Sequence, residues 1–404
     1  MGELRTRKRG KTWEYSFEGA KVAGKRKPIS KGGFRTKEEA IKAGTAAKAE
    51  YDNCGRTFSP SDISVADYMD YWFSNYVTQL SYNSQLDYEN KIRIHIKPIL
   101  GKYRLVSLEP DMIQKWIDDK KRSGLSQSMV NNLFHCLSGA LNYAVAPCKY
   151  IKYNPCQYVR IPKIKSTKQQ TEHREYICIP DDFNKIIERF PEGSSFYLPI
   201  IIGYHCGTRI GETYGIDLLR DIDFNNHTLR IERQMQKKKS KWEYKDPKYD
   251  SFRTIKIDPL LESILKREIH NRKKLMLKYG QYYTRSYVSP DSEIIQVSGN
   301  VEIALQEVMP LSVKENGDLL TPESFKYCSR VVHQELGNPL FHSHCLRHTH
   351  GTILAENGAS PRSVMERLGH KDIKTTLSTY IFNTDKMQED TVNIFYNTLT
   401  LPTA

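Results

Sequence analysis

Hydrophobic periodicity divides the chain into segments of different expected structure. Near the N-terminus, residues 13–17 alternate aromatic and polar side chains, as a half-buried strand does. Residues 27–33 can pair with this strand after a turn at Gly24, and residues 36–39 have the sequence of a capping box that opens a helix. We therefore predict that residues 1–55 form a small module of one short sheet and one helix.

Residues 62–160 show the three-to-four spacing of an all-helical domain. Four helices are marked by Val65, Met69, Trp72 and Phe73, by Ile92, Ile94 and Ile96 before an end at Pro98, by Met112, Ile113 and Trp116, and by Val130, Leu133, Leu137 and Leu141. The last helix, over residues 128–145, carries Asn131, Asn132, His135 and Asn142 on its other faces. Short polar side chains on an exposed helix can contact base edges, and they can equally be solvated.

A basic segment over residues 149–168 contains Pro155 and Pro162 and no acidic residue, which predicts an extended connector. The following residues, 172–385, begin and end with helical patterns. Their middle is β-like, at residues 221–224, 228–233 and 252–257. The expected fold is a multidomain α+β chain, with a β-sheet-plus-helix module, an all-α domain and a mixed α/β domain.

Charge is concentrated in the first two-fifths of the 404 residues. The chain has 61 Lys and Arg against 47 Asp and Glu, a net charge of +14. Residues 1–60 contribute +8 and residues 61–170 contribute +6, so the remainder is balanced. Such a field favours a polyanionic partner. A solvated basic surface is the alternative, but no basic amphipathic helix and no apolar run of about 18 residues indicates a membrane.

The N-terminal residues and the cysteines predict a cytoplasmic protein. No apolar stretch follows the first basic residues, so no secretory signal is expected, although Gly2 fits the loose myristoylation pattern. The 8 cysteines are scattered without paired short spacing, which is typical of reduced thiols.

Candidate chemistry gathers between residues 204 and 380. Arg209 stands at a helix start with Glu212 available to orient it, and residues 245–255 resemble a hairpin tip followed by a strand. Three further features are the His344-x-x-Arg347 spacing, the Leu368-Gly369-His370 segment and Tyr380. We expect no cofactor to be needed.

These residue types suit phosphoryl transfer. Two arginines can bind phosphate bidentately and neutralise the charge of its transition state. A tyrosine, whose pKa is ordinarily near 10, becomes a nucleophile when a histidine takes its proton. A lysine on a flexible loop can protonate the leaving alkoxide.

A metal site is the competing interpretation of the histidines. His344 and His348 are four residues apart beside Cys345, but a zinc site needs three or four converging ligands. Arg347 lies on the same helix face, where a cation disfavours a divalent metal. His348 and His350 are otherwise expected to be capping or core residues.

The ordered set of Arg209, Lys248, His344, Arg347, His370 and Tyr380 resembles the tyrosine recombinase (phage integrase) family, in particular integrases of conjugative transposons and temperate phages. The resemblance covers nearly the whole chain. It implies phosphate clamping by Arg209 and Arg347 and protonation by Lys248, with Lys245 as the alternative acid. It also implies His344 as proton acceptor, His370 as phosphate hydrogen-bond donor and Tyr380 as nucleophile. Cys206 and Cys345 depart from residues common in the family, at positions that are not catalytic.

The resemblance also implies the reaction and the partners. The expected domains are an arm-type DNA-binding module (residues 1–55), a core-binding domain (62–160), a catalytic domain (172–385) and a tail helix (386–404) that docks on a neighbouring protomer. Four protomers would bind double-stranded DNA at core and arm att sites, with accessory DNA-bending or excision factors. Cleavage would proceed through a 3′-phosphotyrosine without metal or ATP.

Two alternatives remain open at this level. A type IB DNA topoisomerase uses a similar set of Arg, Lys, His and Tyr residues but acts as a monomer. A non-catalytic DNA-binding protein would account for the charge distribution alone.

Overall fold

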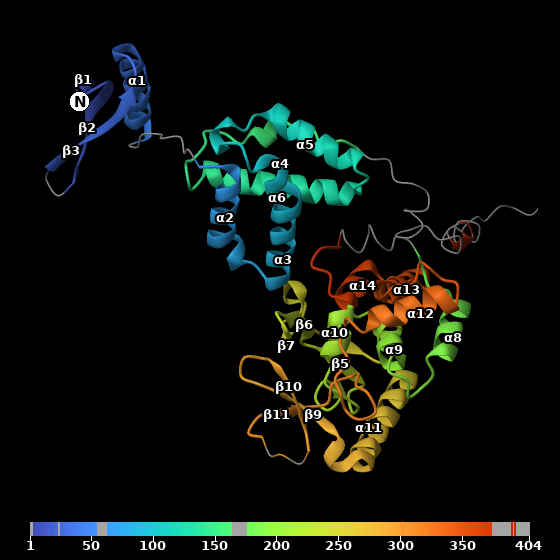
Figure 1. The fold of residues 1–404 in the computed structure, drawn as a ribbon. Helices are drawn as coiled ribbons and strands as arrows, with labels where there is room; N and C mark the ends of the chain where they lie inside the picture. The colour runs from blue at the N-terminus through green and yellow to red at the C-terminus, as the bar shows by residue number, and fades with distance from the viewer. Residues whose placement is uncertain are drawn as a thin grey trace, which may run out of the picture. The chain divides into compact units, whose positions relative to one another are not determined.

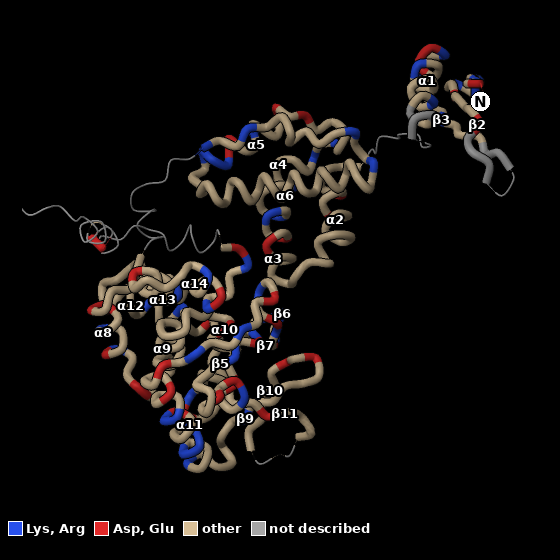
Figure 2. The backbone as a smooth tube through the Cα atoms, turned by 180° about the vertical axis from the view of Figure 1, so that it is seen from behind, with Lys and Arg blue, Asp and Glu red and all other residues tan. Residues whose placement is uncertain are grey.

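The computed structural model describes residues 3–22, 25–54, 63–163, 176–299 and 303–373, together with positions 301, 389, 390 and 392. The chain forms two compact units, residues 1–165 and 166–404, and each has its own hydrophobic cores (Figure 1). Lys and Arg residues are mixed with Asp and Glu residues on both units (Figure 2). Within the described residues, no helix is long and apolar enough to cross a membrane.

The N-terminal module consists of an antiparallel sheet and one helix. Its strands, in the order β1-β2-β3, are β1 (Arg5–Arg9), β2 (Thr12–Val22) and β3 (Lys25–Phe34), and its helix is α1 (Lys37–Cys54). Phe17 pairs with Ile29 across β2 and β3, which confirms the predicted pairing of these segments. Tyr15, Phe17 and Ala47 are buried together and form the small core of this module.

Two details of this module differ from the sequence pattern. The pattern misses β1, because four of its five residues are charged and it shows no apolar alternation. Arg7 and Arg9 of this strand pair with the buried Glu14 of β2. The predicted capping box is half formed. Thr36 accepts the Glu39 backbone N–H at 3.2 Å, but the Glu39 carboxylate accepts the Arg35 N–H in place of that of Thr36.

The helical part of the first unit forms around a dense apolar core. Its α-helices are α2 (Val65–Asn75), α3 (Tyr82–Asn90), α4 (Lys97–Leu100), α5 (Pro110–Arg122) and α6 (Gln127–Val145). Trp72, Trp116 and Leu137 are among its fully buried side chains, as their helical spacing predicts. Of the polar residues predicted on the other faces of α6, Asn132, His135 and Asn142 are exposed and Asn131 is half-buried.

The expected helix end at Pro98 is wrong. A π-helical segment, Lys91–Ile96, joins α3 to α4, and the helical path continues to Leu100. Pro98 lies in the first turn of α4, where a missing backbone N–H is tolerated. A proline is compatible both with the end of one helix and with the first turn of the next, so the sequence pattern could not distinguish the two.

The basic connector is only partly extended. Ile151 and Cys156 are buried in the core of the helical domain, and Pro155–Tyr158 form a 3₁₀ turn. Gln114 of α5 exchanges hydrogen bonds with the Arg160 backbone, at 3.0 Å and 2.9 Å. Its first part therefore packs on the first unit, and the interpretation of that part as an extended linker is wrong. Residues 164–175 lie outside the described residues.

Over its described residues, the second unit combines helices with three small sheets. The helices are α8 (Pro180–Arg189), α9 (Tyr197–Cys206), α10 (Ile210–Gly215), α11 (Pro259–Tyr279), α12 (Phe325–Glu335), α13 (Ser343–Glu356) and α14 (Pro361–Leu368). Helix α9 is apolar on nearly all sides and contacts α10, α11 and α13 (Figure 1). Helix α9 is thus a buried helix against which these three helices pack.

Its sheets are formed by strands β4 to β11. The strands are β4 (Ile222–Asp223), β5 (Thr228–Ile231), β6 (Gln234–Lys238), β7 (Lys241–Lys245), β8 (Arg253–Lys256), β9 (Thr284–Val288), β10 (Ile294–Ser298) and β11 (Gln306–Val308). The sheets have the orders β4-β5-β8, β6-β7 and β10-β9-β11. The predicted strands β4, β5 and β8 are confirmed. The expected hairpin tip at residues 245–255 is wrong, because the tip lies between Lys238 and Lys241 and Lys245 ends β7.

Leu137→Ala tests whether the helical core holds the first unit together. Leu137 is fully buried, so we expect the free energy of unfolding of this unit to fall by about 2–5 kcal/mol. Leu86→Ala is the control, because Leu86 is 39% exposed. Urea unfolding monitored by Trp fluorescence measures both, since Trp72 and Trp116 lie in this core. Equal effects of the two substitutions would contradict the packing described here.

Candidate active site

Arg209 lies immediately before α10 in extended backbone. Glu212, only 1% exposed, accepts the Arg209 backbone N–H on one carboxylate oxygen at 3.0 Å and its guanidinium on the other at 2.7 Å. The predicted orientation of Arg209 by Glu212 is therefore confirmed. The same guanidinium donates to the Gly369 carbonyl at 3.2 Å and to Ser251 Oγ at 3.4 Å.

Arg347 is held in a similar way from α13. Arg347 is 1% exposed, and its guanidinium donates to the Gly207 carbonyl at 2.8 Å. Gly207 and Gly369 follow the last turns of α9 and α14 with φ of 63° and 67°, left-handed values that a glycine adopts without strain. Each of these two turns directs a backbone carbonyl at one of the two arginines. Together they hold Arg209 and Arg347 at the C-terminal ends of α14 and α9.

His344 and His370 lie within electrostatic reach of both arginines. Desolvation and neighbouring positive charge, including Arg347 and Arg209, lower the pKa of His344. Desolvation, Arg347 and Arg209 lower the pKa of His370 to about 4. Both imidazoles are thus neutral at pH 7, each with one nitrogen that donates and one that accepts a hydrogen bond.

The neighbouring histidines have structural partners. His342 caps α13 by accepting the Cys345 backbone N–H at 3.0 Å. The His348 ring packs edge-on against His344, with 4.7 Å between centroids. His350 is buried, with Nδ1 at 2.8 Å from the Tyr204 carbonyl. The expectation that His350 is a core residue is confirmed.

Lys248 lies in the loop that leads from β7 into β8 and is exposed. Its ammonium lies 5.0 Å from the centre of the Tyr249 ring. The loop reaches the arginines through Ser251, three residues further on, which contacts Arg209. Lys245 ends β7 before the loop begins. Tyr380 lies outside the described residues, the nearest of which is Ile373.

Arg253 belongs to this cluster and was missed by the sequence analysis. It begins β8, its side chain is 7% exposed, and it forms an ion pair with Glu212 at 2.8 Å. Alternation in β8 places Arg253 on the same face as the buried Ile255, which was an available signal. A basic residue on a buried face needs a carboxylate partner, and that partner lies 41 residues away in the chain.

The metal interpretation finds no support in the side-chain geometry. Over the part of the chain that the structure describes, no three His, Cys, Asp or Glu side chains are arranged to hold a metal ion. Cys345 is fully buried in the hydrophobic core, whereas the ring of the adjacent His344 packs against His348. The two side chains therefore do not face a common point. Cys206 is likewise fully buried.

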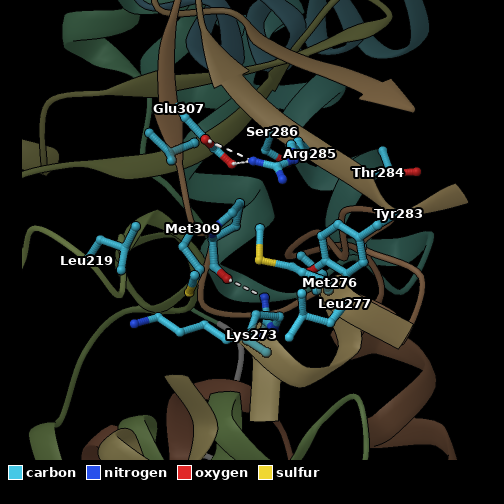
Figure 3. Close-up of a pocket in the computed structure, with 15 residues that line it drawn as sticks. Leu219, Lys273, Met276, Leu277, Tyr283, Thr284, Arg285, Ser286, Glu307 and Met309 are labelled. Atoms are coloured by element: carbon cyan, nitrogen blue, oxygen red, sulfur yellow. Dashed lines mark hydrogen bonds and ion pairs between the residues drawn. The ribbon is translucent and has the colours of Figure 1, made fainter. Parts of the chain in front are cut away.

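A cavity of about 410 Å³ lies elsewhere in the second unit, between α11 and strands β9 and β11 (Figure 3). The Arg285–Glu307 ion pair lies on one side of it, and Met276, Leu277 and Tyr283 lie on another. The five described candidate residues, Arg209, Lys248, His344, Arg347 and His370, are not among the residues that line it.

Comparison with protein families identifies the class of protein. The model of the phage integrase family matches residues 181–387, more than half of the chain, so the chain belongs to this family. The N-terminal SAM-like domain of phage integrases matches residues 64–121, and an arm DNA-binding domain matches residues 5–51. The chain is a tyrosine recombinase of the integrase type, an enzyme of site-specific recombination in mobile elements.

Individual relatives agree with this assignment. The chain is 25% identical over 373 residues to a tyrosine recombinase XerC-like protein of Caldanaerobacter subterraneus subsp. tengcongensis, covering 89% of each protein. It is 23% identical over 321 residues to the ICEBs1 integrase of Bacillus subtilis, covering 76% of this chain and 77% of the relative. In fold, it is similar to the Tn1549 transposon integrase in complex with transposon right-end DNA, with a TM-score of 0.63 and 20% identity, covering 83% of this chain and 100% of that one. A lambda integrase dimer bound to a core site gives a TM-score of 0.51 at 15% identity, covering 95% of each chain.

We expect His350 to make the stability of the second unit depend on pH. Because Arg367 Nε always donates, the contact at 2.9 Å requires His350 Nε2 to accept, and Nδ1 carries the proton toward Tyr204. Burial and then Arg367 lower the pKa of His350 to about 4. The unfolded chain binds this proton near pH 6.5, so the free energy of unfolding should fall as the pH drops from about 6.5 to about 4.

Thermal unfolding between pH 7.5 and 4.5 measures this dependence. We expect His350→Gln to lower the melting temperature at pH 7.5 and to make its further decrease on acidification shallower. His270→Gln, at an exposed position on α11, is the control and should leave the pH dependence unchanged. If the melting temperature of His350→Gln fell with pH as steeply as that of the unmodified chain, the neutral, buried state of His350 would be contradicted.

Proposed function

We propose that the cluster around Arg209 and Arg347 is the catalytic centre of the recombinase, where it cleaves and rejoins DNA through a covalent 3′-phosphotyrosine. The observation that carries this proposal is the convergence of two arginines, from separate helices, beside two neutral histidines. Two guanidiniums fixed by backbone carbonyls match the non-bridging oxygens of a phosphodiester.

In the proposed reaction, the Tyr380 hydroxyl attacks the phosphorus of one strand. A bond forms between phosphorus and the tyrosine oxygen, and the bond from phosphorus to the 5′-oxygen breaks. His344 accepts the tyrosine proton, and Lys248 donates a proton to the departing 5′-oxygen. Arg209, Arg347 and a hydrogen bond from His370 stabilise the non-bridging oxygens.

Rejoining reverses these steps with a different strand. The 5′-hydroxyl of the partner strand attacks the phosphotyrosine, and Tyr380 leaves as the same hydroxyl. One phosphate ester replaces another at each step, so the energy of the bond is conserved and ATP is not required. The charge that develops on the phosphate is met by side-chain cations, and the proposed reaction therefore assigns no role to a metal ion.

The chain architecture supports double-stranded DNA as the substrate. We assign residues 1–55 to arm-type sites, residues 62–160 to core sites and residues 172–385 to catalysis. The first 60 residues carry a net charge of +8, which suits the phosphate backbone. The related lambda integrase forms a tetramer on a Holliday junction, and we propose a homotetramer here as well. The tail over residues 386–404 would dock on a neighbouring protomer, and accessory factors would bend the DNA in the cytoplasm of the bacterial host.

Tyr380→Phe tests the proposed nucleophile. We expect it to abolish the covalent protein–DNA adduct and to retain DNA binding, because the change removes only the attacking oxygen. A nicked duplex containing the element's end junction traps the adduct, which a denaturing gel displays. An adduct formed by Tyr380→Phe would contradict the assignment and direct attention to Tyr249 or Tyr396. Efficient relaxation of a supercoiled plasmid lacking the junction would favour a topoisomerase.

Lys248→Ala tests the proposed general acid. A leaving alcohol needs a proton, whereas a leaving thiol, with a pKa of about 8.5, departs unaided. Sulfur in the bridging 5′ position should therefore restore the cleavage rate of Lys248→Ala. It should not restore the cleavage rate of Arg347→Ala, because this variant lacks the positive charge that stabilises the non-bridging oxygens. Rescue of Lys245→Ala in place of Lys248→Ala would move the acid to the end of β7.

A further inference from the structure

Arg253 joins three segments of the second unit. Its Nε donates to the Arg367 carbonyl at 2.8 Å, and its two terminal nitrogens donate to the Ser251 carbonyl at 3.2 Å and to Glu212 at 2.8 Å. These acceptors belong to the end of α14, the loop that carries Lys248, and the start of α10. With a side chain 7% exposed and all three nitrogens bonded to protein, Arg253 has little surface with which to contact a substrate directly.

Glu212 divides its carboxylate between Arg253 and Arg209. One oxygen accepts both the Arg253 guanidinium and the Arg209 backbone N–H, and the other accepts the Arg209 guanidinium. Burial alone would raise the pKa of Glu212, but Arg253 and then Arg209 outweigh it and lower this pKa. A carboxylate at 1% exposure needs these partners to remain ionised, so the Arg209 anchor depends on Arg253.

Arg253 also packs against the turn that precedes His370. A Cβ atom at Gly369 would lie 2.8 Å from an Arg253 terminal nitrogen, so the guanidinium fills the space beside that glycine. The Gly369 carbonyl in turn accepts from Arg209 at 3.2 Å. Arg209 is thus held by Glu212, Gly369 and Ser251, and Arg253 lies against all three.

We propose that Arg253 is a positioning residue for the cleavage reaction, which acts through Glu212 to fix the guanidinium of Arg209. This inference rests on the proposed function, because it assigns Arg253 a part in the stabilisation of the phosphate by Arg209. Its planar fork reaches three acceptors in different directions, and a lysine ammonium at the same position cannot reproduce that geometry.

The test compares Arg253→Lys with a matched control, Arg272→Lys. Arg272 is also a buried arginine of this unit, 4% exposed, bonded to Glu268 and to the carbonyls of Pro310 and Leu311, and it lies away from the site. Single-turnover cleavage of the nicked junction duplex is measured well below the melting temperature of each full-length variant. Equilibrium binding to the same duplex is measured in parallel.

We expect Arg253→Lys to cleave about 10- to 100-fold more slowly, since a displacement of about 1 Å in a catalytic group has effects of this size. Its affinity for DNA should remain near that of the unmodified chain, and Arg272→Lys should cleave at the unmodified rate. Glu212→Gln should reproduce the defect by removing the charge that links the two arginines. Sulfur in the bridging 5′ position should leave the defect of Arg253→Lys in place, because Arg209 acts on the non-bridging oxygens.

Three results would overturn the inference. They are an unimpaired cleavage rate in Arg253→Lys, an equal loss in Arg272→Lys, and full rescue of Arg253→Lys by sulfur, which would place its effect on Lys248. If the unmodified chain forms no adduct while binding the duplex, the proposed function itself fails, and the role of Arg253 fails with it. Adduct formation by the unmodified chain therefore distinguishes a failure of this inference alone from a failure of the proposed function.

Discussion

The buried carboxylate of Glu212 is the interaction on which the geometry of the site depends. Removing an ionised carboxylate from water costs several kcal/mol unless charge partners and hydrogen bonds compensate. Here, two guanidiniums and one backbone N–H provide that compensation, from Arg253 and Arg209. Because those groups come from β8 and from the start of α10, the ionised carboxylate requires both segments to be in place.

The site carries more positive than negative charge before any substrate binds. Arg209 and Arg253 share the buried carboxylate of Glu212, and Arg347 lies within electrostatic reach of the same two histidines. Desolvation and then the surrounding positive charge lower the pKa of both histidines, so they add no further charge. An arriving phosphodiester would supply the missing negative charge. In the proposed reaction, substrate binding and stabilisation of the transition state would both use this positive charge, in a place where burial strengthens each electrostatic contact.

The sequence predicts those parts of the molecule that depend on neighbours along the chain. Helical periodicity places the core of the first unit, and the spacing of Arg209 and Glu212 predicts their contact because the two lie three residues apart. The anchors of the arginines are not predictable in this way. Gly207 and Arg347 are separated by 140 residues, and Arg209 and Gly369 by 160 residues. Their approach depends on how α9, α13 and α14 pack.

The pattern of hydrophobic and polar residues also fails to predict strands that bury few side chains. The hairpin of β6 and β7 is rich in lysine and buries little beyond Met235 and Tyr244, which pair across it, so its alternation is weak. Arg253 was missed for the opposite reason. Its strand is short, and a charged residue on a buried face is recognised only once its distant partner is known.

Anchoring of Arg209 and Arg347 by the carbonyls of two glycines affects how such an enzyme can diverge. A backbone carbonyl is present whatever side chain a residue carries, so many substitutions around the site leave these two contacts available. The constraint falls instead on Gly207 and Gly369, where a Cβ atom would approach neighbouring atoms within 2.5 Å and 2.8 Å. The side chains of the surrounding surface can therefore vary, while the proposed phosphate-binding geometry depends on two residues without side chains.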